Sequence, residues 1–289
     1  MPALTVSVVV PTRDRLGSLA AALDALRRQR EAGPFELIVV DDGSADGTGA
    51  FLAGLAAQGA LVHLRGERRG PAAARNAGIA RCRGQIIACT DDDCEVPADW
   101  VSRLRGRLVE TGAAAVGGRV VAAADASRAG RISQAISNGV ARVLNDDAPE
   151  AAFLTSNNVA YRADVLRESG LFDEGFTGAG GEERELHERL SARGLRLVYD
   201  PDLVVAHRPR MGWSGFVRQQ AAYGRGARRF YDLPRGRSPR PRGLGLGQYL
   251  RAFAAAVGEV RPGDRAALAL GLPLSQAAVA WGYLRAPRP

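Results

Sequence analysis

The chain of 289 residues contains no lysine, and all 39 of its basic residues are arginines. A P-loop needs a lysine on its phosphates, a protein kinase needs a lysine on a strand, and Schiff-base catalysis needs a reactive amine. The absence of lysine therefore excludes these three kinds of active site.

Cysteine is scarce as well. Cys82, Cys89 and Cys94 are spaced seven and five residues apart, which is not a zinc-site pattern, and an odd number is a poor basis for disulfides. Such cysteines suit a reducing cytosol. The N-terminus also lacks a basic stretch followed by a long apolar run, as a signal peptide would have. We therefore expect a cytoplasmic protein, with the inner face of the plasma membrane as an alternative location.

Acidic residues are nearly missing from one segment. Residues 207–242 contain ten arginines and one acid, Asp232, so this segment carries +9 while the whole chain carries +8. A basic patch of this kind indicates phosphates, lipid head groups or nucleic acid as a partner, or else a solvated surface. Nucleic acid is the less favoured partner, because the nearby aromatic residues do not form a recognised binding module.

Apolar, strand-like runs alternate with segments of helical spacing in the first half of the chain. We predict strands over 6–10, 36–40, 61–64, 86–89 and 198–206, and helices over 16–28, 48–57 and 71–81. This alternation predicts an α/β fold with a mostly parallel sheet flanked by helices. Residues 120–147 show no regular pattern, residues 235–247 predict a linker, and residues 248–284 predict helix.

Three predicted loops follow strands at 11–14, 41–44 and 91–93, and two of these loops are acidic. Parallel sheets bind ligands beyond the carboxyl ends of their strands. The adjacent carboxylates of Asp91, Asp92 and Asp93 repel one another, and a hard cation such as Mg²⁺ or Mn²⁺ would offset this repulsion. If the backbone is extended there, Asp91 and Asp93 point the same way and Asp92 points elsewhere.

Four segments resemble, in order and spacing, the motifs of family-two glycosyltransferases. These are VSVVVPTRDR, ELIVVDDGSADGT, GPAAARNAGIARCRGQIIACTDDDCEVPADW and SNNVAYRADVLRESGLFDEGFTGAGGEERELHERLSARG, and the resemblance covers about residues 6–207. It implies the Rossmann-like GT-A fold, a nucleotide-sugar donor, a divalent metal and inversion at the anomeric carbon. We accordingly predict a GT-A catalytic domain over 1–210 and a basic, helical C-terminal extension over 211–289.

The same resemblance implies roles for individual residues at the donor site. Pro11, Thr12 and Arg13 match the first nucleotide-binding loop, Asp42 matches the acid that contacts the nucleobase, and Arg75 and Asn76 flank the donor. Asp91, Asp92 and Asp93 match the Asp-x-Asp motif. Asp93 is the strongest metal ligand in this interpretation, Asp91 faces the ribose or the metal, and His207 matches a histidine that some relatives use near the metal and diphosphate.

The family places its general base in a Glu-Asp pair that opens a helix, and the matching pair here is Glu182 and Glu183. Glutamate stands where aspartate is expected at position 183, so the carboxylate is displaced by about 1 Å, which can matter greatly. Either the pocket adapts or Glu182 is the base, and a plain helix N-terminus is the structural alternative. Asn158 matches an acceptor-side position. We expect His187 on the polar face of this helix, and Trp100 in the core.

The C-terminal segment has apolar stretches. Residues 265–284 are interrupted by Pro273, Ser275 and Gln276, and their length is marginal for crossing a bilayer, which takes about 20 residues. The preceding stretch fits an amphipathic surface helix. Together with the basic segment, they favour peripheral contact with an anionic membrane. The alternative is a helical appendage that packs on the catalytic domain or on another subunit.

The sequence thus predicts a metal-dependent inverting glycosyltransferase. Its donor is a nucleotide-diphosphate sugar, with UDP-sugars favoured, and its acceptor is a hydroxyl of a lipid-linked or cell-envelope glycan. A nucleotidyltransferase is the alternative, but VVVPTRDR lacks the glycine run and the lysine that grip a triphosphate. A non-catalytic nucleotide-sugar binding protein is supported only by Glu183. The oligomeric state stays open.

Overall fold

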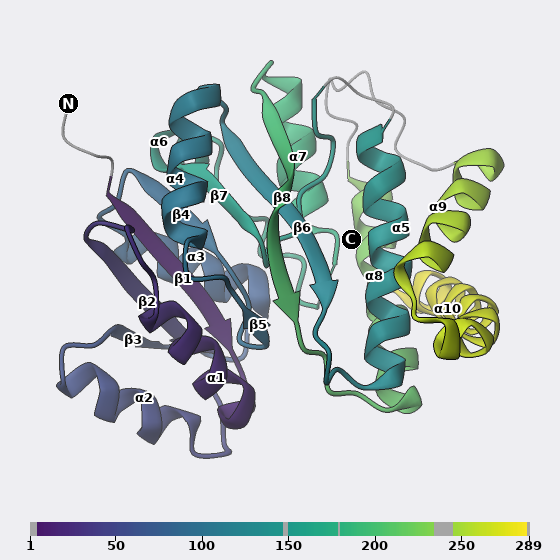
Figure 1. Cartoon of the computed structure of the whole chain (residues 1–289), viewed down its shortest axis with the longest axis horizontal. Coiled ribbons are helices and arrows are strands. Elements are labelled where there is room, and N and C mark those ends of the chain that lie inside the picture. Colours follow the sequence, from purple (N-terminus) through teal and green to yellow (C-terminus); the bar gives the residue numbers. More distant parts are fainter. Residues whose placement is uncertain (1–4, 147–149, 179, 234–244, 288–289) are drawn as a thin grey trace.

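The structure is a computed structural model that describes residues 5–146, 150–178, 180–233 and 245–287, so most of the predicted linker lies outside the described residues. One eight-stranded sheet runs through the molecule in the order β3-β2-β1-β4-β7-β6-β8-β5 (Figure 1). Its strands are β1 Val6–Thr12, β2 Phe35–Asp41, β3 Val62–Arg65, β4 Ile86–Cys89, β5 Cys94–Glu95, β6 Ala115–Ala122, β7 Val159–Arg162 and β8 Leu197–His207.

Most strands of the sheet share one direction. β1 pairs in parallel with β2 and β4, β2 pairs in parallel with β3, and β6 pairs in parallel with β8. Only β7 and β5 are reversed among the described strands, since β7 lies antiparallel between β4 and β6 and β5 is antiparallel to β8. The predicted α/β fold with a mostly parallel sheet is confirmed.

The late strand β8 continues through Asp200-Pro201-Asp202, although a proline cannot complete a ladder of backbone hydrogen bonds. Its pairing with β6 shifts register between Gly118 and Arg119, so residues of β8 are skipped there. A bulge accommodates a proline, because proline has no N–H to give to the ladder.

Helices cover both faces of the sheet and form a third group beside it. They are α1 Leu16–Arg27, α2 Thr48–Ala57, α3 Pro71–Arg81, α4 Trp100–Thr111, α5 Arg128–Asp146, α6 Ala163–Glu168, α7 Glu182–Ala192, α8 Trp213–Asp232, α9 Leu246–Glu259 and α10 Arg265–Arg285. The expected helices over 16–28, 48–57 and 71–81 are therefore found.

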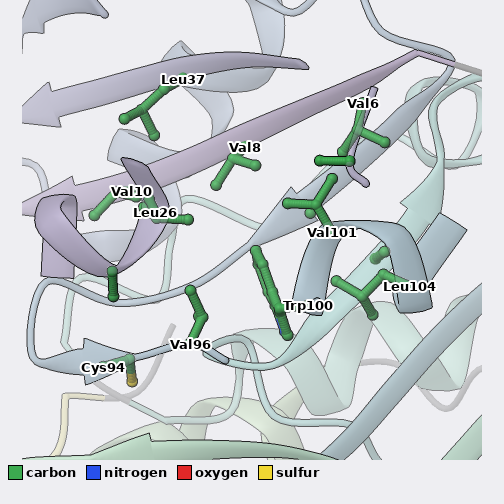
Figure 2. Close-up of a cluster of buried hydrophobic side chains, with 14 of the residues drawn as sticks. Val6, Val8, Val10, Leu26, Leu37, Cys94, Val96, Trp100, Val101 and Leu104 are labelled. Atoms are coloured by element: carbon green, nitrogen blue, oxygen red, sulfur yellow. The ribbon is translucent and has the colours of Figure 1, made fainter. Parts of the chain in front are cut away.

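The core has one layer on each face of the sheet, as alternation along β1 requires. Val8 and Val10 join the layer that contains α1 and α4, where Trp100 is fully buried as expected (Figure 2). Val9 joins the opposite layer, with residues of α3, α6 and α7. This double burial explains why β1 is an almost continuous apolar run.

A third apolar cluster lies among α5, α8, α9 and α10, beside the sheet (Figure 1). Glycines permit close approach there: a Cβ at Gly139 of α5 would lie 2.1 Å from the Ala252 carbonyl oxygen of α9, and one at Gly224 of α8 would lie 2.0 Å from that of Val279 in α10. The predicted domain boundary at residue 210 falls between β8 and α8, yet the helices beyond it pack on α5, which precedes it.

The absence of a regular pattern over residues 120–147 was a wrong prediction. Residues 120–122 end β6, and residues 128–146 form the 19-residue helix α5. Gly130, Ser133, Ser137 and Gly139 lower the intrinsic helix propensity of this segment. The helix forms because its apolar face packs on the other helices. Ile132, Ile136 and Val140 do recur at helical spacing, so this signal was present in the sequence.

The C-terminal helix is long and apolar enough, by length and composition alone, to cross a membrane. Together with a preceding single turn it spans Pro262–Arg285, with a mean hydropathy of 1.3, and 28% of its apolar window is buried inside the molecule. Buried helices of water-soluble proteins can meet the same criterion, so this is weak support for a membrane span.

Candidate active site

A cavity of about 960 Å³ lies where β1, β2 and β4 end, between the sheet and the helices α5, α7, α8 and α10. This size is at the upper end of the usual range for ligand pockets. Most of the predicted site residues line it together: Pro11, Thr12, Arg13, Asp42, Arg75, Asp91, Asp92, Asp93, Glu182, Glu183 and His207.

The three adjacent aspartates do not have the predicted extended arrangement. The Cys94 N–H donates a 3.1 Å hydrogen bond to the Asp91 carbonyl, so the backbone turns at Asp92 and Asp93. As a result Asp92 and Asp93 both contact Arg15, at 3.1 and 2.6 Å, while Asp91 lies 2.8 Å from Arg75. These two arginines supply part of the charge compensation that the sequence interpretation assigned to a metal alone.

Asp93 also contacts His207, whose Nε2 lies 3.1 Å from Asp93 Oδ1. The other ring nitrogen, Nδ1, is 2.7 Å from Gln134 Oε1 on α5. Burial alone would raise the pKa of Asp93, but His207 and Arg15 outweigh burial and lower this pKa. Burial raises the pKa of Asp92 even though Arg15 opposes the change. The neighbouring residues thus shift the pKa values of Asp92 and Asp93 in opposite directions.

A divalent cation fits the residues around Asp93. Ligand atoms of Asp93, Cys94 and His207 lie within 4.8 Å of one another. Asp93 Oδ1 is buried and accepts no well-aligned hydrogen bond in the described structure. Burial keeps the pKa of the Cys94 thiol well above its usual value, so this sulfur stays protonated and is a poor ligand. The remaining oxygen and nitrogen donors suit Mg²⁺ or Mn²⁺.

Glu182 and Glu183 begin α7, and their surroundings differ. Glu182 is 2% exposed and lies 3.3 Å from Arg75. Burial, reinforced by the neighbouring Glu183, raises the pKa of Glu182 to about 8. Glu183 instead accepts a 2.9 Å hydrogen bond from the Ser156 hydroxyl. Glu182 therefore contacts a buried arginine, Arg75, whereas Glu183 accepts a hydrogen bond from a neutral hydroxyl at the cavity wall.

Asp42 holds backbone as well as lining the cavity. Its two carboxylate oxygens accept hydrogen bonds from the N–H groups of Arg69 and Gly70, at 3.0 and 2.9 Å. Gly70 has φ +96°, and a Cβ there would lie 2.4 Å from the Thr177 carbonyl oxygen, so only glycine fits. Asp42 thereby fixes the start of α3. Its predicted contact with the nucleobase stays a prediction.

Two of the predicted residues do not line the cavity. Asn76 donates to the Phe172 carbonyl at 2.9 Å and accepts from the Phe172 N–H at 3.1 Å, so it ties α3 to the loop before α7. Asn158 is fully buried, accepts a 2.9 Å hydrogen bond from the Trp100 indole, and donates to the carbonyls of Arg119 and Leu203. Its amide is occupied in holding β6, β8 and α4 together, which corrects its placement on the acceptor side.

His187 was predicted on the polar face of α7 and is instead fully buried. Its Nδ1 accepts from the Leu154 N–H at 3.3 Å, and its Nε2 lies 2.9 Å from the Tyr161 hydroxyl. Burial lowers the pKa of His187 to about 3, so the ring is neutral. The predicted polar face was wrong because α7 is packed against the segment that precedes β7.

Sequence reasoning missed several residues of the cavity wall. Arg15 lies in the loop after β1, and a basic residue at the end of a strand beside acidic loops could have pointed to it. Gln134, Ser156 and Tyr223 carry no such signal, because distant parts of the chain bring them to the cavity.

Several curated proteins that are similar to this chain are named as glycosyltransferases. The pre-mycofactocin glycosyltransferase of Mycobacterium tuberculosis is 31% identical over 229 residues, which are 76% of this chain and 46% of that protein. This chain therefore spans about half the length of that relative. Glycosyltransferase AglE of Haloferax volcanii is 25% identical over 235 residues, covering 80% of this chain and 75% of that protein.

Solved structures with the same fold include two complexes with nucleotide sugars. The mannosyltransferase PcManGT of Pyrobaculum calidifontis with GDP-Man and Mn²⁺ aligns with a TM-score of 0.64 at 20% identity, covering 97% of this chain and 86% of that one. S. aureus TarS 1–349 with UDP-GlcNAc aligns with a TM-score of 0.57 at 17% identity, covering 97% and 89%. At these identities the likeness shows the fold, which is the predicted GT-A fold.

The predicted family is tested by a match over more than half of the chain. Residues 7–170 match the family described as Glycosyl transferase family 2, and this range contains the loop after β1 and the three adjacent aspartates. The chain belongs to glycosyl transferase family 2.

Proposed function

We propose that this protein transfers a sugar from a nucleotide-diphosphate donor to an acceptor hydroxyl, with inversion and with the help of Mg²⁺ or Mn²⁺. The observation that carries the proposal is the meeting of Asp91, Asp93, His207 and Glu183 in one cavity at the ends of parallel strands. Solved relatives of this fold bind GDP-Man with Mn²⁺ and UDP-GlcNAc, which supports a nucleotide-sugar donor. UDP-sugars remain our favoured donors.

Asp93 and His207 would hold the cation, with Asp91 beside them. The cation supplies neutralisation of the charge that develops on the leaving diphosphate. Arg15 contributes fixed positive charge at the same place. Thr12 donates a 2.7 Å hydrogen bond to Asp92, which holds the loop after β1 against the acidic turn.

Glu183 is the general base in this proposal. The acceptor oxygen forms a bond to the anomeric carbon, the bond from that carbon to the diphosphate oxygen breaks, and the acceptor proton passes to the Glu183 carboxylate. The hydrogen bond from Ser156 orients this carboxylate. Glu182 is a positioning residue, because it holds Arg75, which in turn contacts Asp91.

The broader setting follows the sequence interpretation. We propose a cytoplasmic enzyme with a catalytic domain over residues 1–210 and a helical extension over 211–289, which contacts an anionic membrane peripherally. The acceptor is a glycan or a lipid-linked hydroxyl. Four described arginines of the basic segment pair with acids, namely Arg208, Arg210, Arg228 and Arg229, so the patch is partly neutralised. This favours a modest rather than a strong attraction to anionic lipid.

A thermal-shift panel tests the donor site. UDP, GDP, TDP, CDP and ADP are each added with and without Mn²⁺ or Mg²⁺. Ligand at 100 times its dissociation constant stabilises a protein by about 2.7 kcal/mol. We expect a metal-dependent shift for one diphosphate that disappears in Asp93→Ala and persists in Asp24→Ala, a change of an exposed aspartate on α1. No metal-dependent shift with any diphosphate would refute the proposal.

A further inference from the structure

The half of the cavity that lies away from the sheet is built by α5, α8 and α10 side by side. Ser133 donates to Gln219 Oε1 at 2.6 Å and accepts from Gln220 at 3.1 Å. Ser275 donates to Gln220 Oε1 at 2.7 Å. These side chains form one polar tier across the three helices, at the level of Gln134, which contacts His207.

The same three helices also meet beyond this polar tier. Tyr223 of α8 and Ser137 of α5 both line the cavity, and Gly224 lies against the backbone of Val279 in α10. Gly282 of α10 also lies against the Ala221 carbonyl, so α8 and α10 pack closely over these residues. Leu144 lies ten residues after Gln134 on α5, a rise of about 15 Å.

Beyond the polar tier the cavity wall becomes apolar and aromatic. The residues recur at helical spacing on each helix, so one stripe of each faces the cavity. They are Val140 and Leu144 on α5, Tyr223, Ala227, Phe230 and Tyr231 on α8, Val279, Ala280, Tyr283 and Leu284 on α10, and Tyr249 on α9.

Glu183 lies where the polar and apolar parts of the cavity meet. Tyr223, the first aromatic residue of the apolar part, is close enough to Gly180 that a Cβ there would lie 2.6 Å from its ring. Burial raises the pKa of Tyr223, and Glu183 is the next cause. On the other side of Glu183, Arg184 lies 4.6 Å from the centre of the Phe230 ring. Aromatic rings of α8 therefore contact the short segment, residues 180–184, that carries the proposed base.

The apolar part of the cavity continues to the molecular surface. Leu284 at its end is 79% exposed, and Tyr231 and Tyr249 are each more than one-third exposed. On the outside of α9 and α10, Leu246, Leu250 and Trp281 are exposed as well. An apolar path therefore leads from the proposed base to an apolar surface of the extension.

A nucleotide sugar is anionic and hydroxyl-rich, so it gains little from these walls, whereas an alkyl or isoprenoid chain gains by leaving water. We propose that the acceptor is an amphiphile, with its hydroxyl-bearing head group at Glu183 and its apolar chain between α5, α8 and α10. This inference rests on the proposed function and decides between its two acceptor classes in favour of the lipid-linked one.

The test uses n-alkyl β-glucosides of four, six and eight carbons, below their micelle concentrations, with glucose as the reference. Binding to the full chain is measured by calorimetry in the presence of Mn²⁺ and the diphosphate that gives the thermal shift. A fully buried methylene strengthens binding by about fourfold. We therefore expect at least about a tenfold gain in affinity from butyl to octyl, because even partial burial of four methylenes exceeds this factor.

Two variants place a charge on the apolar path, Val279→Asp on α10 and Val140→Asp on α5. Both should reduce octyl glucoside binding to the level of glucose. The matched control is Val257→Asp on α9, because Val257 is exposed and does not line the cavity. It should leave binding unchanged. The metal-dependent diphosphate shift, measured in parallel, should persist in all three variants and shows that each has folded.

The outcomes separate the two proposals. If the diphosphate shift is present but affinity is independent of chain length, the amphiphilic acceptor is refuted and the transferase proposal survives. Equal losses in Val257→Asp and Val279→Asp would also refute it, since binding would then lie on the outer surface. If no diphosphate gives a shift in the unmodified protein, the proposed function itself fails.

Discussion

The Ser156 hydroxyl donates a 2.9 Å hydrogen bond to Glu183 Oε1, although the two residues are 27 positions apart in the chain. Ser156 lies just before β7 and Glu183 opens α7, so the contact joins two elements beside the cavity. The adjacent Glu182 contacts Arg75 instead. This difference in partners assigns different roles to two carboxylates that the sequence left interchangeable.

Replacement of Glu183 by glutamine should lower kcat by about 10²–10⁴-fold, because the amide cannot accept the acceptor proton. Glu182→Gln should have a much smaller effect at pH 7, since a carboxyl with a pKa of about 8 is mostly protonated and resembles the amide. Release of the nucleoside diphosphate, followed with saturating acceptor, measures both. A larger loss in Glu182→Gln than in Glu183→Gln would reverse the two roles.

The raised pKa of Glu182 also predicts how stability changes with pH. Between the usual carboxyl value of about 4.5 and about 8, the folded protein holds a proton here that the unfolded chain releases. Stability therefore falls as pH rises through this range, by at most about 1.4 kcal/mol per pH unit from this group. Glu182→Gln should remove this contribution, so its stability relative to the unmodified protein, measured by urea unfolding, increases from pH 5 to pH 8. If the difference in stability between the variant and the unmodified protein does not change with pH, the pKa of Glu182 is not raised in the folded protein.

The sequence predicted much of the site because its residues follow strands. Parallel strands end at the same edge of a sheet, so Thr12, Asp42 and Asp91 had to lie near one another once the strands were identified. The same local reasoning failed for the turn at Asp92, whose direction is set by a backbone hydrogen bond and by Arg15. Periodicity shows where a chain is extended, but not where side chains of a short turn point.

The apolar part of the cavity was not predicted, because the helical spacing of Ile136, Val140 and Leu144 does not show which other helices lie against it. Helix α5 contains glycines that lower its propensity, and the need for Gly139 becomes visible only when α9 lies against it. Asn158 was misplaced for a related reason. An asparagine in a motif of the catalytic domain suggests a ligand contact, but its three hydrogen bonds are all to the protein interior.

The interior role of Asn158 predicts a loss of stability on truncation. Asn158→Ala leaves the Trp100 indole N–H and two carbonyls without this partner, and each unsatisfied buried group costs about 1–3 kcal/mol. We expect the free energy of unfolding to fall by at least about 2 kcal/mol in urea. Asn157→Ala is the matched control, because Asn157 lines the cavity and should affect stability less. If Asn158→Ala is as stable as the unmodified protein, its amide does not hold the sheet.

His187 predicts an acid dependence of opposite sign to that of Glu182. Its Nδ1 accepts the Leu154 N–H, so the ring proton is on Nε2 and is donated to the Tyr161 hydroxyl. A second proton would have to sit on Nδ1, facing the Leu154 N–H in a buried site. Burial disfavours the charged ring and lowers the pKa of His187 to about 3 in the folded state, from 6.5 for a free histidine.

Between pH 6.5 and about 3 the unfolded chain therefore binds a proton at position 187 that the folded protein does not, and stability falls as pH falls. From pH 6.5 to 4.5 this slope opposes that of Glu182, so the unmodified protein can show a flat profile that hides both groups. Urea unfolding of His187→Gln should reveal a slope: its stability relative to the unmodified protein should improve on acidification from pH 6.5 to 4.5. A relative stability of His187→Gln that does not vary with pH would mean that His187 is protonated in the folded protein, against its two hydrogen bonds.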